Sequence, residues 1–361
     1  MMITGGGTGG HLYPALAVAE AVRMRRPGLN LLFIGLDAVQ DRQEVERRGF
    51  AFMGLPLLGW RRRFSMRNAK ALLLFVWGIF RCVKQWRRFQ PGVVFGVGGY
   101  VSAPAMIAGR WLKWKVALHE QNTVPGLVNR MLARGCDRVF ITFEQTRRRL
   151  PGRTCECTGF PLRREVIQPA PHRPKEKREP DVGGNLLLIG GSQGARRLVE
   201  TACGTFVEWN RRALPFKARV QTGEKNLEWA RQLPWPEGIE LVPFIHDMAA
   251  AYAEADLMIS RAGAGSLAEI ALWGLPAVLI PYPYSSENHQ AVNAEEWQAA
   301  GAAVVIPESQ LTPAGLGDVL EDLLTHPDRR EEMSRKALGL ARRDAADVLA
   351  DRLIQMLEAA A

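Results

Sequence analysis

Two glycine-rich loops in the first third of the chain carry side chains suited to group-transfer chemistry. Residues 5–11 read GGGTGGH after a short apolar run, and residues 96–104 read GVGGYVSAP after another, with the phenol of Tyr100. Glycines let backbone N–H groups approach an anion or a sugar closely where a helix begins. An unperturbed imidazole titrates near pH ~6.5, so His11 is the first candidate for a general base, and a structural histidine is the alternative.

Four consecutive polar residues follow the apolar run Val116–Leu118. They are His119, Glu120, Gln121 and Asn122. Ligands of open α/β sheets bind at the carboxyl ends of the strands, so this position favours a binding site over a hydrogen-bonded turn. Glu120 is the second candidate for the general base.

The second half of the chain contains two more glycine-rich loops, each before a predicted helix. Residues 190–195, GGSQGA, place Ser192 at the predicted start of a helix, a suitable seat for a diphosphate. Residues 260–269, SRAGAGSLAE, add Arg261 as a cation and Glu269 as a carboxylate that can accept both hydroxyls of a ribose. The alternative for Glu269 is a surface group that interacts with the helix dipole.

The same motifs leave one other chemistry open and exclude another. The first loop also satisfies G-x-G-x-x-G, and Asp37 follows the next apolar run, so an NAD-type site stays open; no Gly-Lys-Ser/Thr follows, which excludes a P-loop. The chain contains no D-x-D and no cluster with metal-ligand spacing. We therefore expect no metal and no cofactor, with helix N-termini and Arg163 or Arg261 neutralising a diphosphate.

The elements that position these motifs are predicted to be buried parallel strands alternating with helices, an α/β fold. Continuous Val, Ile and Leu runs separated by helix-length segments are typical of parallel sheets covered on both faces. At 361 residues two domains are expected, and residues 186–195 echo residues 2–10 as a second strand–glycine–helix unit. The predicted strands are 29–35, 93–97, 115–119, 138–142, 217–222, 240–243, 257–260 and 277–280. A polar linker is predicted within 164–184, and one or two helices within 329–361.

Charge and cysteine content limit the function classes. Residues 1–163 hold 26 Lys and Arg against 9 Asp and Glu, a net charge of +17, whereas residues 164–361 carry −7. The first half is therefore expected near polyanions such as anionic lipid, phosphorylated substrate or nucleic acid, although no nucleic-acid-binding module is recognisable. The five cysteines form no C-x-x-C pair, and the start MMITGGG lacks the features of a secretory signal, so a reduced, non-exported protein is expected.

An apolar segment between basic clusters gives a possible membrane signal. Ala71–Phe80 is too short for the roughly 20 residues of a spanning helix. Basic and aromatic residues around it favour an interfacial helix on anionic lipid, and a buried core helix is the alternative. These flanking residues are Arg61, Arg62, Arg63, Arg67, Lys70, Arg81, Lys84, Trp86, Arg87, Arg88 and Phe89, with Trp111, Lys113, Trp114 and Lys115 further on.

The five motifs at 5–11, 96–104, 119–122, 190–195 and 260–269 together resemble the MurG family, in order and over nearly the whole chain. Its members are two-domain GT-B glycosyltransferases. The resemblance implies two Rossmann-like domains with parallel sheets facing a central cleft. It implies an acceptor- and membrane-facing domain at 1–163, a UDP-sugar domain at 185–339, and a C-terminal helix at about 340–361 that packs back on the first domain.

The resemblance also implies roles for individual residues. Thr8, Gly9, Gly10 and Asn122 match positions that face sugar and acceptor, and His11 matches a proposed base. Arg163 and Ser192 match positions near the diphosphate, and Ile245 matches a backbone contact to uracil. The nucleotide and ribose loop corresponds to Ala264, Gly265, Ser266, Leu267, Ala268 and Glu269, and Gln290 to a contact with N-acetylglucosamine. The chain departs from the usual family pattern at Phe160 and His289.

The implied activity is inverting transfer of N-acetylglucosamine from UDP-N-acetylglucosamine to undecaprenyl-diphospho-muramoylpentapeptide, converting lipid I to lipid II in peptidoglycan synthesis. That reaction serves cell-wall biogenesis, cell shape and cell division. The implied partners are the two substrates and the anionic surface at the cytoplasmic face of the bacterial inner membrane, with no nucleic acid. The alternatives are another GT-B UDP-sugar:glycolipid transferase and an NAD(P)-binding oxidoreductase.

Overall fold

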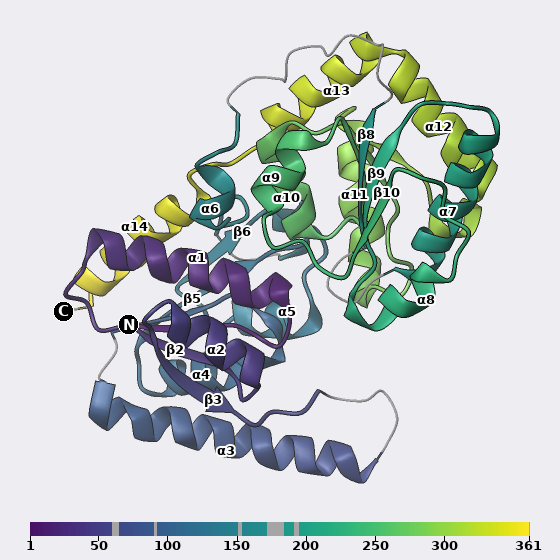
Figure 1. Ribbon diagram of the computed structural model, residues 1–361. Coiled ribbons are helices and arrows are strands. Elements are labelled where there is room, and N and C mark those ends of the chain that lie inside the picture. Colours follow the sequence, from purple (N-terminus) through teal and green to yellow (C-terminus); the bar gives the residue numbers. More distant parts are fainter. Residues whose placement is uncertain (60–64, 90–91, 151–153, 172–183, 191–194, 361) are drawn as a thin grey trace. The chain divides into compact units, whose positions relative to one another are not determined.

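The computed structural model describes residues 1–59, 65–89, 92–150, 154–171, 184–190 and 195–360, which form two compact units (Figure 1). Unit 1 comprises Met1–Arg163 and Arg342–Ala361, and unit 2 comprises Arg164–Ala341. Each unit contains one sheet in which every strand pairing is parallel. The predicted α/β class with parallel sheets is confirmed.

Unit 1 has a seven-stranded sheet of order β3-β2-β1-β4-β5-β6-β7. The strands are β1 (Met2–Thr4), β2 (Leu32–Leu36), β3 (Ala51–Leu55), β4 (Val93–Gly96), β5 (Lys115–Glu120), β6 (Arg138–Ile141) and β7 (Cys155–Cys157). The helices are α1 (Gly9–Arg25), α2 (Val39–Arg47), α3 (Met66–Phe89), α4 (Gly99–Trp111), α5 (Leu127–Ala133) and α14 (Ala345–Glu358). The strand order reverses between β1 and β4, which creates a topological switch point.

Alternate side chains of this sheet enter two separate cores, as the period of two in a strand requires. Ile3 and Phe33 belong to the core that α1 and α14 cover. Met2 and Leu32 belong to the core on the opposite face, which contains side chains of α3 and α4. Both faces are therefore buried, and this explains why the strands read as continuous apolar runs.

The C-terminal helix α14 packs against α1, although more than 300 residues separate them in the chain (Figure 1). Leu349 and Leu353 of α14 are fully buried in the same core as Leu16 of α1. The Arg25 guanidinium of α1 forms an ion pair with Asp347 at 2.6 Å and another with Asp351. These pairs are partly exposed, so the apolar contact supplies most of the stabilisation.

Unit 2 repeats the plan with six strands in the order β10-β9-β8-β11-β12-β13. The strands are β8 (Asn185–Ile189), β9 (Lys217–Gln221), β10 (Ile239–Val242), β11 (Leu257–Ser260), β12 (Ala277–Leu279) and β13 (Val304–Val305). The helices are α6 (Arg164–Ile167), α7 (Arg196–Arg211), α8 (Leu227–Arg231), α9 (Met248–Glu254), α10 (Ala264–Trp273), α11 (His289–Ala299), α12 (Pro313–Thr325) and α13 (Pro327–Gly339). Here the order reverses between β8 and β11.

Helix α3 confirms the core interpretation of residues 71–80 for one of its faces, and the interfacial interpretation of the other face stays a prediction. Ala71, Gly78, Ile79 and Cys82 are buried on the face toward α4, whereas other apolar side chains of α3 are exposed. Trp114 is only 6% exposed and belongs to the core, so its assignment to a membrane-facing surface is wrong. None of the helices in the described ranges combines the length and apolarity needed to cross a membrane.

Candidate functional site

The first glycine loop leaves β1 at the switch point of unit 1. Helix α1 begins at Gly9, with Thr8 in extended conformation as its N-cap. Gly6 and Gly7 have φ values of +134° and +77°, which favour glycine. Thr8 and Gly10 are exposed and Gly9 is partly exposed, so the first turn is accessible to a ligand.

An acidic residue does contact this loop, but it is Asp41 of α2. The Asp41 carboxylate accepts a hydrogen bond from the Gly7 backbone N–H at 2.8 Å, and burial raises the pKa of its carboxyl group. Asp37, the predicted dinucleotide ligand, instead forms an ion pair with Arg42 at 3.2 Å. No sequence motif indicates Asp41, because it lies inside a helix that only the tertiary structure brings to the loop.

The second glycine loop supports the His11 ring. A β-carbon on Gly99 would lie 3.3 Å from Cδ2 and Nε2 of His11, and Gly99 has a φ of +74°. The two loops that follow β1 and β4 therefore meet at His11. Tyr100 follows Gly99 and is 36% exposed, and partial burial raises the pKa of its phenol.

The four polar residues that end β5 divide into three buried groups and one partly exposed group. His119 Nε2 lies 2.9 Å from the Gly159 carbonyl oxygen, to which it must donate, and burial lowers its pKa to about 4. The Gln121 amide donates to the Val97 carbonyl. Asn122 alone is partly accessible, which fits its predicted contact with a ligand.

Glu120 is 1% exposed and its two oxygens are held inside the protein. Oε1 accepts from the Asn122 backbone N–H at 2.9 Å, and Oε2 accepts from the Asn129 amide at 2.6 Å. Burial raises the pKa of this carboxyl group to about 7, opposed by these hydrogen bonds. The closed environment favours the half-buried His11 over Glu120 as the group that meets a substrate hydroxyl.

Arg163, the last residue of the first segment of unit 1, lies over the ring of Tyr13. Its Cζ is 4.4 Å from the ring centroid, and both side chains are partly exposed. Tyr13 belongs to α1, so the stacking holds a cation near the helix that begins with the glycine loop. Its predicted role toward a diphosphate stays a prediction.

In unit 2, buried polar groups hold the loop after β11 in place. The Arg261 guanidinium donates to the carbonyls of Ile280 and Pro281 and forms a buried ion pair with Glu308. Asn293 of α11 donates to the Ala262 carbonyl at 3.2 Å. Arg261 thus supports the loop that begins α10, and its expected contact with a diphosphate stays a prediction. The sequence did not indicate Asn293 or Glu308.

Glu269 lies in α10 at the end of the predicted nucleotide segment, residues 264–269. Its Oε2 accepts a hydrogen bond from the hydroxyl of the buried Tyr252 at 2.5 Å, and the side chain is only partly exposed. The carboxylate is thus held by a buried side chain, and its contact with a ribose stays a prediction. Tyr252 of α9 orients the carboxylate, a contact that the sequence did not reveal.

The remaining predicted ligands of unit 2 lie in loops at the carboxyl ends of its strands. Ile245 is buried between the exposed side chains of Phe244 and His246 in the loop after β10. Gln290 lies in the first turn of α11, and its Oε1 accepts from the Tyr282 backbone N–H at 2.9 Å. Ser192 falls outside the described residues.

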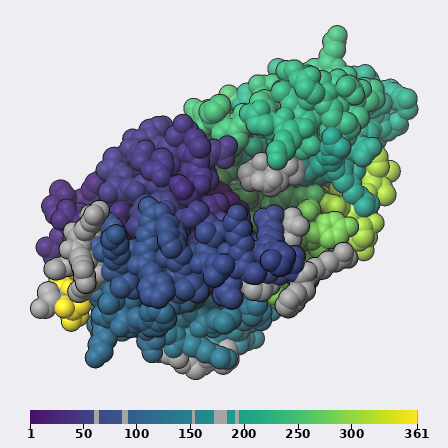
Figure 2. All heavy atoms as spheres, turned by 90° about the horizontal axis from the view of Figure 1, so that it is seen from below, coloured from purple at the N-terminus to yellow at the C-terminus, as the bar shows by residue number. Residues whose placement is uncertain are grey.

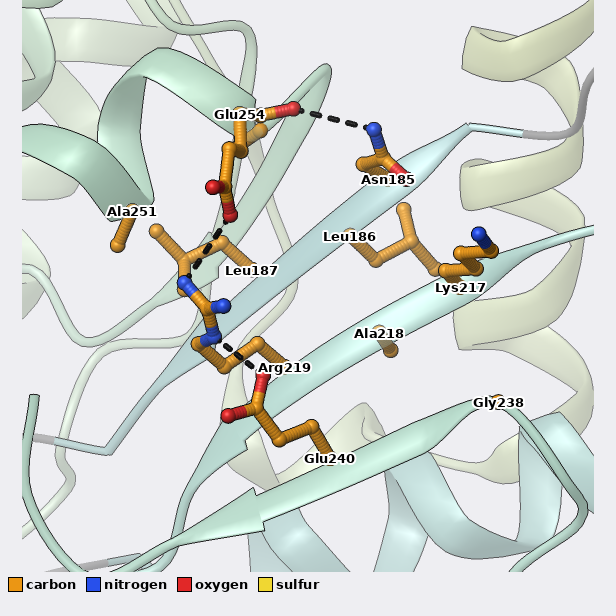
Figure 3. A pocket seen from close by; sticks show the side chains of 11 residues that line it. Asn185, Leu186, Leu187, Lys217, Ala218, Arg219, Gly238, Glu240, Ala251 and Glu254 are labelled. Atoms are coloured by element: carbon orange, nitrogen blue, oxygen red, sulfur yellow. Dashed lines mark hydrogen bonds and ion pairs between the residues drawn. The ribbon is translucent and has the colours of Figure 1, made fainter.

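A cavity of about 310 Å³ in unit 2 lies away from these loops (Figure 3). It is lined by the amino ends of β8 and β9, including Asn185 and Lys217. Its Arg219 side chain is neutralised by Glu240 at 2.6 Å and Glu254 at 3.2 Å. Ligands of such sheets bind at the carboxyl ends, so this cavity is not the candidate site. In the described ranges no three His, Cys, Asp or Glu side chains form a metal-binding cluster.

Two family models match the chain in the order of its units. The N-terminal domain of glycosyltransferase family 28 matches residues 1–141, and the C-terminal domain of that family matches residues 185–349. Together with the two parallel sheets, they define a GT-B glycosyltransferase of family 28.

Individual relatives narrow this class. The UDP-N-acetylglucosamine--N-acetylmuramyl-(pentapeptide) pyrophosphoryl-undecaprenol N-acetylglucosamine transferase of Geobacter metallireducens is 38% identical over 98% of both chains. The enzyme of the same name from Halalkalibacterium halodurans is 35% identical over 97% of both. The crystal structure of Acinetobacter baumannii MurG has a TM-score of 0.79 and 28% identity, covering 98% of this chain and 99% of that one. This chain belongs to the MurG family.

A more distant neighbour shows why fold alone does not decide the reaction. The UDP-GlcNAc 2-epimerase of Neisseria meningitidis has a TM-score of 0.67 at 12% identity, covering 98% of this chain and 99% of that one. That likeness shows the fold alone. The family assignment decides against the oxidoreductase and nucleic-acid alternatives.

The buried Glu120 predicts a pH-dependent stability. Its carboxyl pKa is raised from 4.5 to about 7, so the native protein holds a proton that the unfolded chain has lost between these values. The free energy of unfolding therefore falls as pH rises through this window. Glu120→Gln does not titrate, so its stability relative to wild type should rise by about 3 kcal/mol between pH ~4.5 and ~8.

Urea unfolding of both proteins at several pH values measures this change. Glu46→Gln removes an exposed carboxylate of α2 and serves as the control, with a nearly constant difference from wild type. A wild-type-minus-Glu120→Gln difference that is also independent of pH would contradict the raised pKa.

Proposed function

We propose that this chain transfers N-acetylglucosamine from UDP-N-acetylglucosamine to the C4 hydroxyl of the muramoyl sugar of undecaprenyl-diphospho-muramoylpentapeptide. The observation that carries the proposal is 35–38% identity over nearly the whole chain to relatives named for this transfer. Donor groups are assigned to unit 2 and acceptor groups to unit 1, as the resemblance of the motifs implies.

The reaction is a direct displacement at the anomeric carbon. The acceptor O4 forms a bond to C1 of N-acetylglucosamine while the bond from C1 to the β-phosphate oxygen breaks, which inverts the configuration and releases UDP. His11 takes the O4 proton as general base, and its ring is held for this role by Gly99. Backbone amides at helix starts and the Arg163 guanidinium stabilise negative charge on the diphosphate.

The donor is held by the loops of unit 2. The Glu269 carboxylate, oriented by Tyr252, accepts hydrogen bonds from the ribose hydroxyls. The Ile245 backbone contacts uracil, residues 264–268 surround the nucleotide, and Gln290 contacts the N-acetyl sugar. In unit 1, Thr8, Gly9, Gly10, Tyr100 and Asn122 contact the acceptor.

Membrane docking through α3 brings the enzyme to its lipid-linked acceptor at the cytoplasmic face of the inner membrane. Leu73 is 72% and Phe80 62% exposed on this helix, which crosses the face drawn in Figure 2 as blue spheres. Exposed basic residues accompany them, namely Arg67, Lys70, Arg81 and Lys84. An apolar stripe between cations fits an anionic lipid surface, to which each cation contributes about 1 kcal/mol.

The activity is tested by UDP release from UDP-N-acetylglucosamine with and without a muramoyl-diphospholipid acceptor. Release should require both substrates. His11→Ala should lower kcat by about 10²- to 10⁴-fold, the usual contribution of a general base, with little change in the KM for the donor. His326→Ala, which changes an exposed histidine of unit 2, is the control. A wild type that releases no UDP contradicts the activity, and normal turnover of His11→Ala contradicts the assignment of the base.

The ribose contact predicts a donor-specific effect. Glu269→Ala should raise the KM for UDP-N-acetylglucosamine about ten- to hundredfold, because charge-assisted hydrogen bonds contribute about 1.5–3 kcal/mol each. Tyr252→Phe keeps the carboxylate and loses only its orienting hydrogen bond, so its effect should be smaller. Steady-state kinetics at saturating acceptor measure both. An unchanged KM in Glu269→Ala would remove the residue from the nucleotide site.

The membrane proposal predicts salt-sensitive binding to vesicles that contain phosphatidylglycerol. A Leu73→Ser, Phe80→Ser, Lys84→Glu variant should lose most of this binding and keep donor binding, since none of these residues lies in unit 2. The matched control is Met24→Ser, Val39→Ser, which changes exposed apolar side chains elsewhere in unit 1. Co-sedimentation at low and high salt distinguishes them. Equal binding of the α3 variant and wild type would disprove docking through α3.

A further inference from the structure

Asn129 of α5 is a buried polar residue to which the sequence motifs assign no role. It is 3% exposed, and its amide Nδ2 donates to Glu120 Oε2 at 2.6 Å. Few side chains of this size are buried without a requirement for their hydrogen bonds. The amide therefore acts on a carboxylate inside the protein.

The same side chain also supports the second glycine loop. A β-carbon on Gly98 would lie 2.4 Å from Asn129 Nδ2, and Gly98 has a φ of +92°, so the loop backbone rests directly on the amide. The next residue, Gly99, lies against the His11 ring. A continuous line of contacts thus runs from Glu120 through Asn129 and the Gly98–Gly99 backbone to His11.

Glu120 also connects these contacts to the loop after β5, which contains Asn122. Its other oxygen accepts from the Asn122 backbone N–H at 2.9 Å, and Asn122 is the partly exposed residue of its motif. Both Glu120 oxygens thus face N–H donors. N–H donors at both oxygens stabilise the ionised carboxylate more than the protonated carboxyl, so they oppose the effect of burial.

We propose that Asn129 is a positioning residue for the transfer reaction: it keeps Glu120 ionised and thereby holds the Asn122 loop and the Gly98–Gly99 loop in place beside His11. The inference rests on the proposed function only in the effect on turnover. The hydrogen bonds and the burial of Glu120 belong to unit 1 itself.

The electrostatic surroundings of Glu120 support the role of Asn129. Burial raises the pKa of Glu120, and hydrogen bonds from Asn122, Asn129 and Gly126 lower it. Titratable residues on the surrounding elements include His119 on β5, His11 on α1, Tyr100 on α4 and Arg130 on α5. His119 is neutral above pH 4, so it supplies no positive charge to replace the amide at neutral pH.

The test replaces Asn129 with a residue of similar size that has no donor. Asn129→Leu should raise the pKa of Glu120 and move the acid limb of the kcat–pH profile up by about one to two pH units, as loss of a hydrogen bond to a charged group predicts. At pH 7, kcat should fall about tenfold and recover at higher pH, while the donor KM stays within about twofold. Asn129→Ser keeps a hydroxyl donor, so it should shift the Glu120 pKa and the acid limb less. It is also the variant to measure if Asn129→Leu does not fold.

Two measurements separate positioning from a general loss of structure. ¹³C NMR titration of the Glu120 carboxyl measures its pKa without substrate. It therefore tests the effect of Asn129 on Glu120 even if the proposed activity fails. Leu132→Ala weakens the packing of α5 without touching Glu120 and should move neither the NMR pKa nor the acid limb. The proposal is overturned if the Glu120 pKa is unchanged in both Asn129 variants, if it moves without the kcat profile, or if Leu132→Ala shifts the profile equally.

Discussion

Divergence of two neighbouring parallel strands is the constraint on which the site in unit 1 depends. The chain leaves β1 toward the face that α1 and α14 cover and leaves β4 toward the face that α3 and α4 cover. No crossover helix can then occupy the space directly beyond the carboxyl ends of these two strands. The glycine loops line this space with backbone rather than with side chains. Unit 2 shows the same reversal of strand order between β8 and β11.

Buried polar groups beneath the loops keep this backbone in position. In unit 1 they are Asp41, Glu120 and Asn129; in unit 2 they are Arg261, Asn293 and Glu308. Each of these groups contacts the backbone of a loop or another buried polar group. Its loss would leave a buried partner without its hydrogen bond or ion pair and would remove support from the loop. Except for Glu120 and Arg261, these supporting groups differ from the residues predicted to contact a substrate.

The described surfaces of the two units differ in character. Unit 1 carries the exposed apolar side chains of α3 with cations around them, which suits a lipid-linked acceptor. Unit 2 carries Glu269 and the loops suited to a soluble nucleotide sugar. The relatives named for such a transfer match this chain across both units.

The sequence by itself determined the α/β class, most strands and the motif residues, because buried parallel strands read as apolar runs and glycine loops have a local signature. It missed β3, β7 and β13; β3 and β7 are only partly buried along their length, and neither residue of the two-residue β13 is fully buried. It also gave no sign of Asp41, Asn129, Tyr252 or Glu308, and it placed Trp114 on the surface. Those outcomes depend on contacts between residues far apart in the chain, such as Gly7 with Asp41 and Arg261 with Glu308, which a local pattern does not encode. Burial of Glu120 is likewise a property of the assembled fold, and its raised pKa follows from that burial alone.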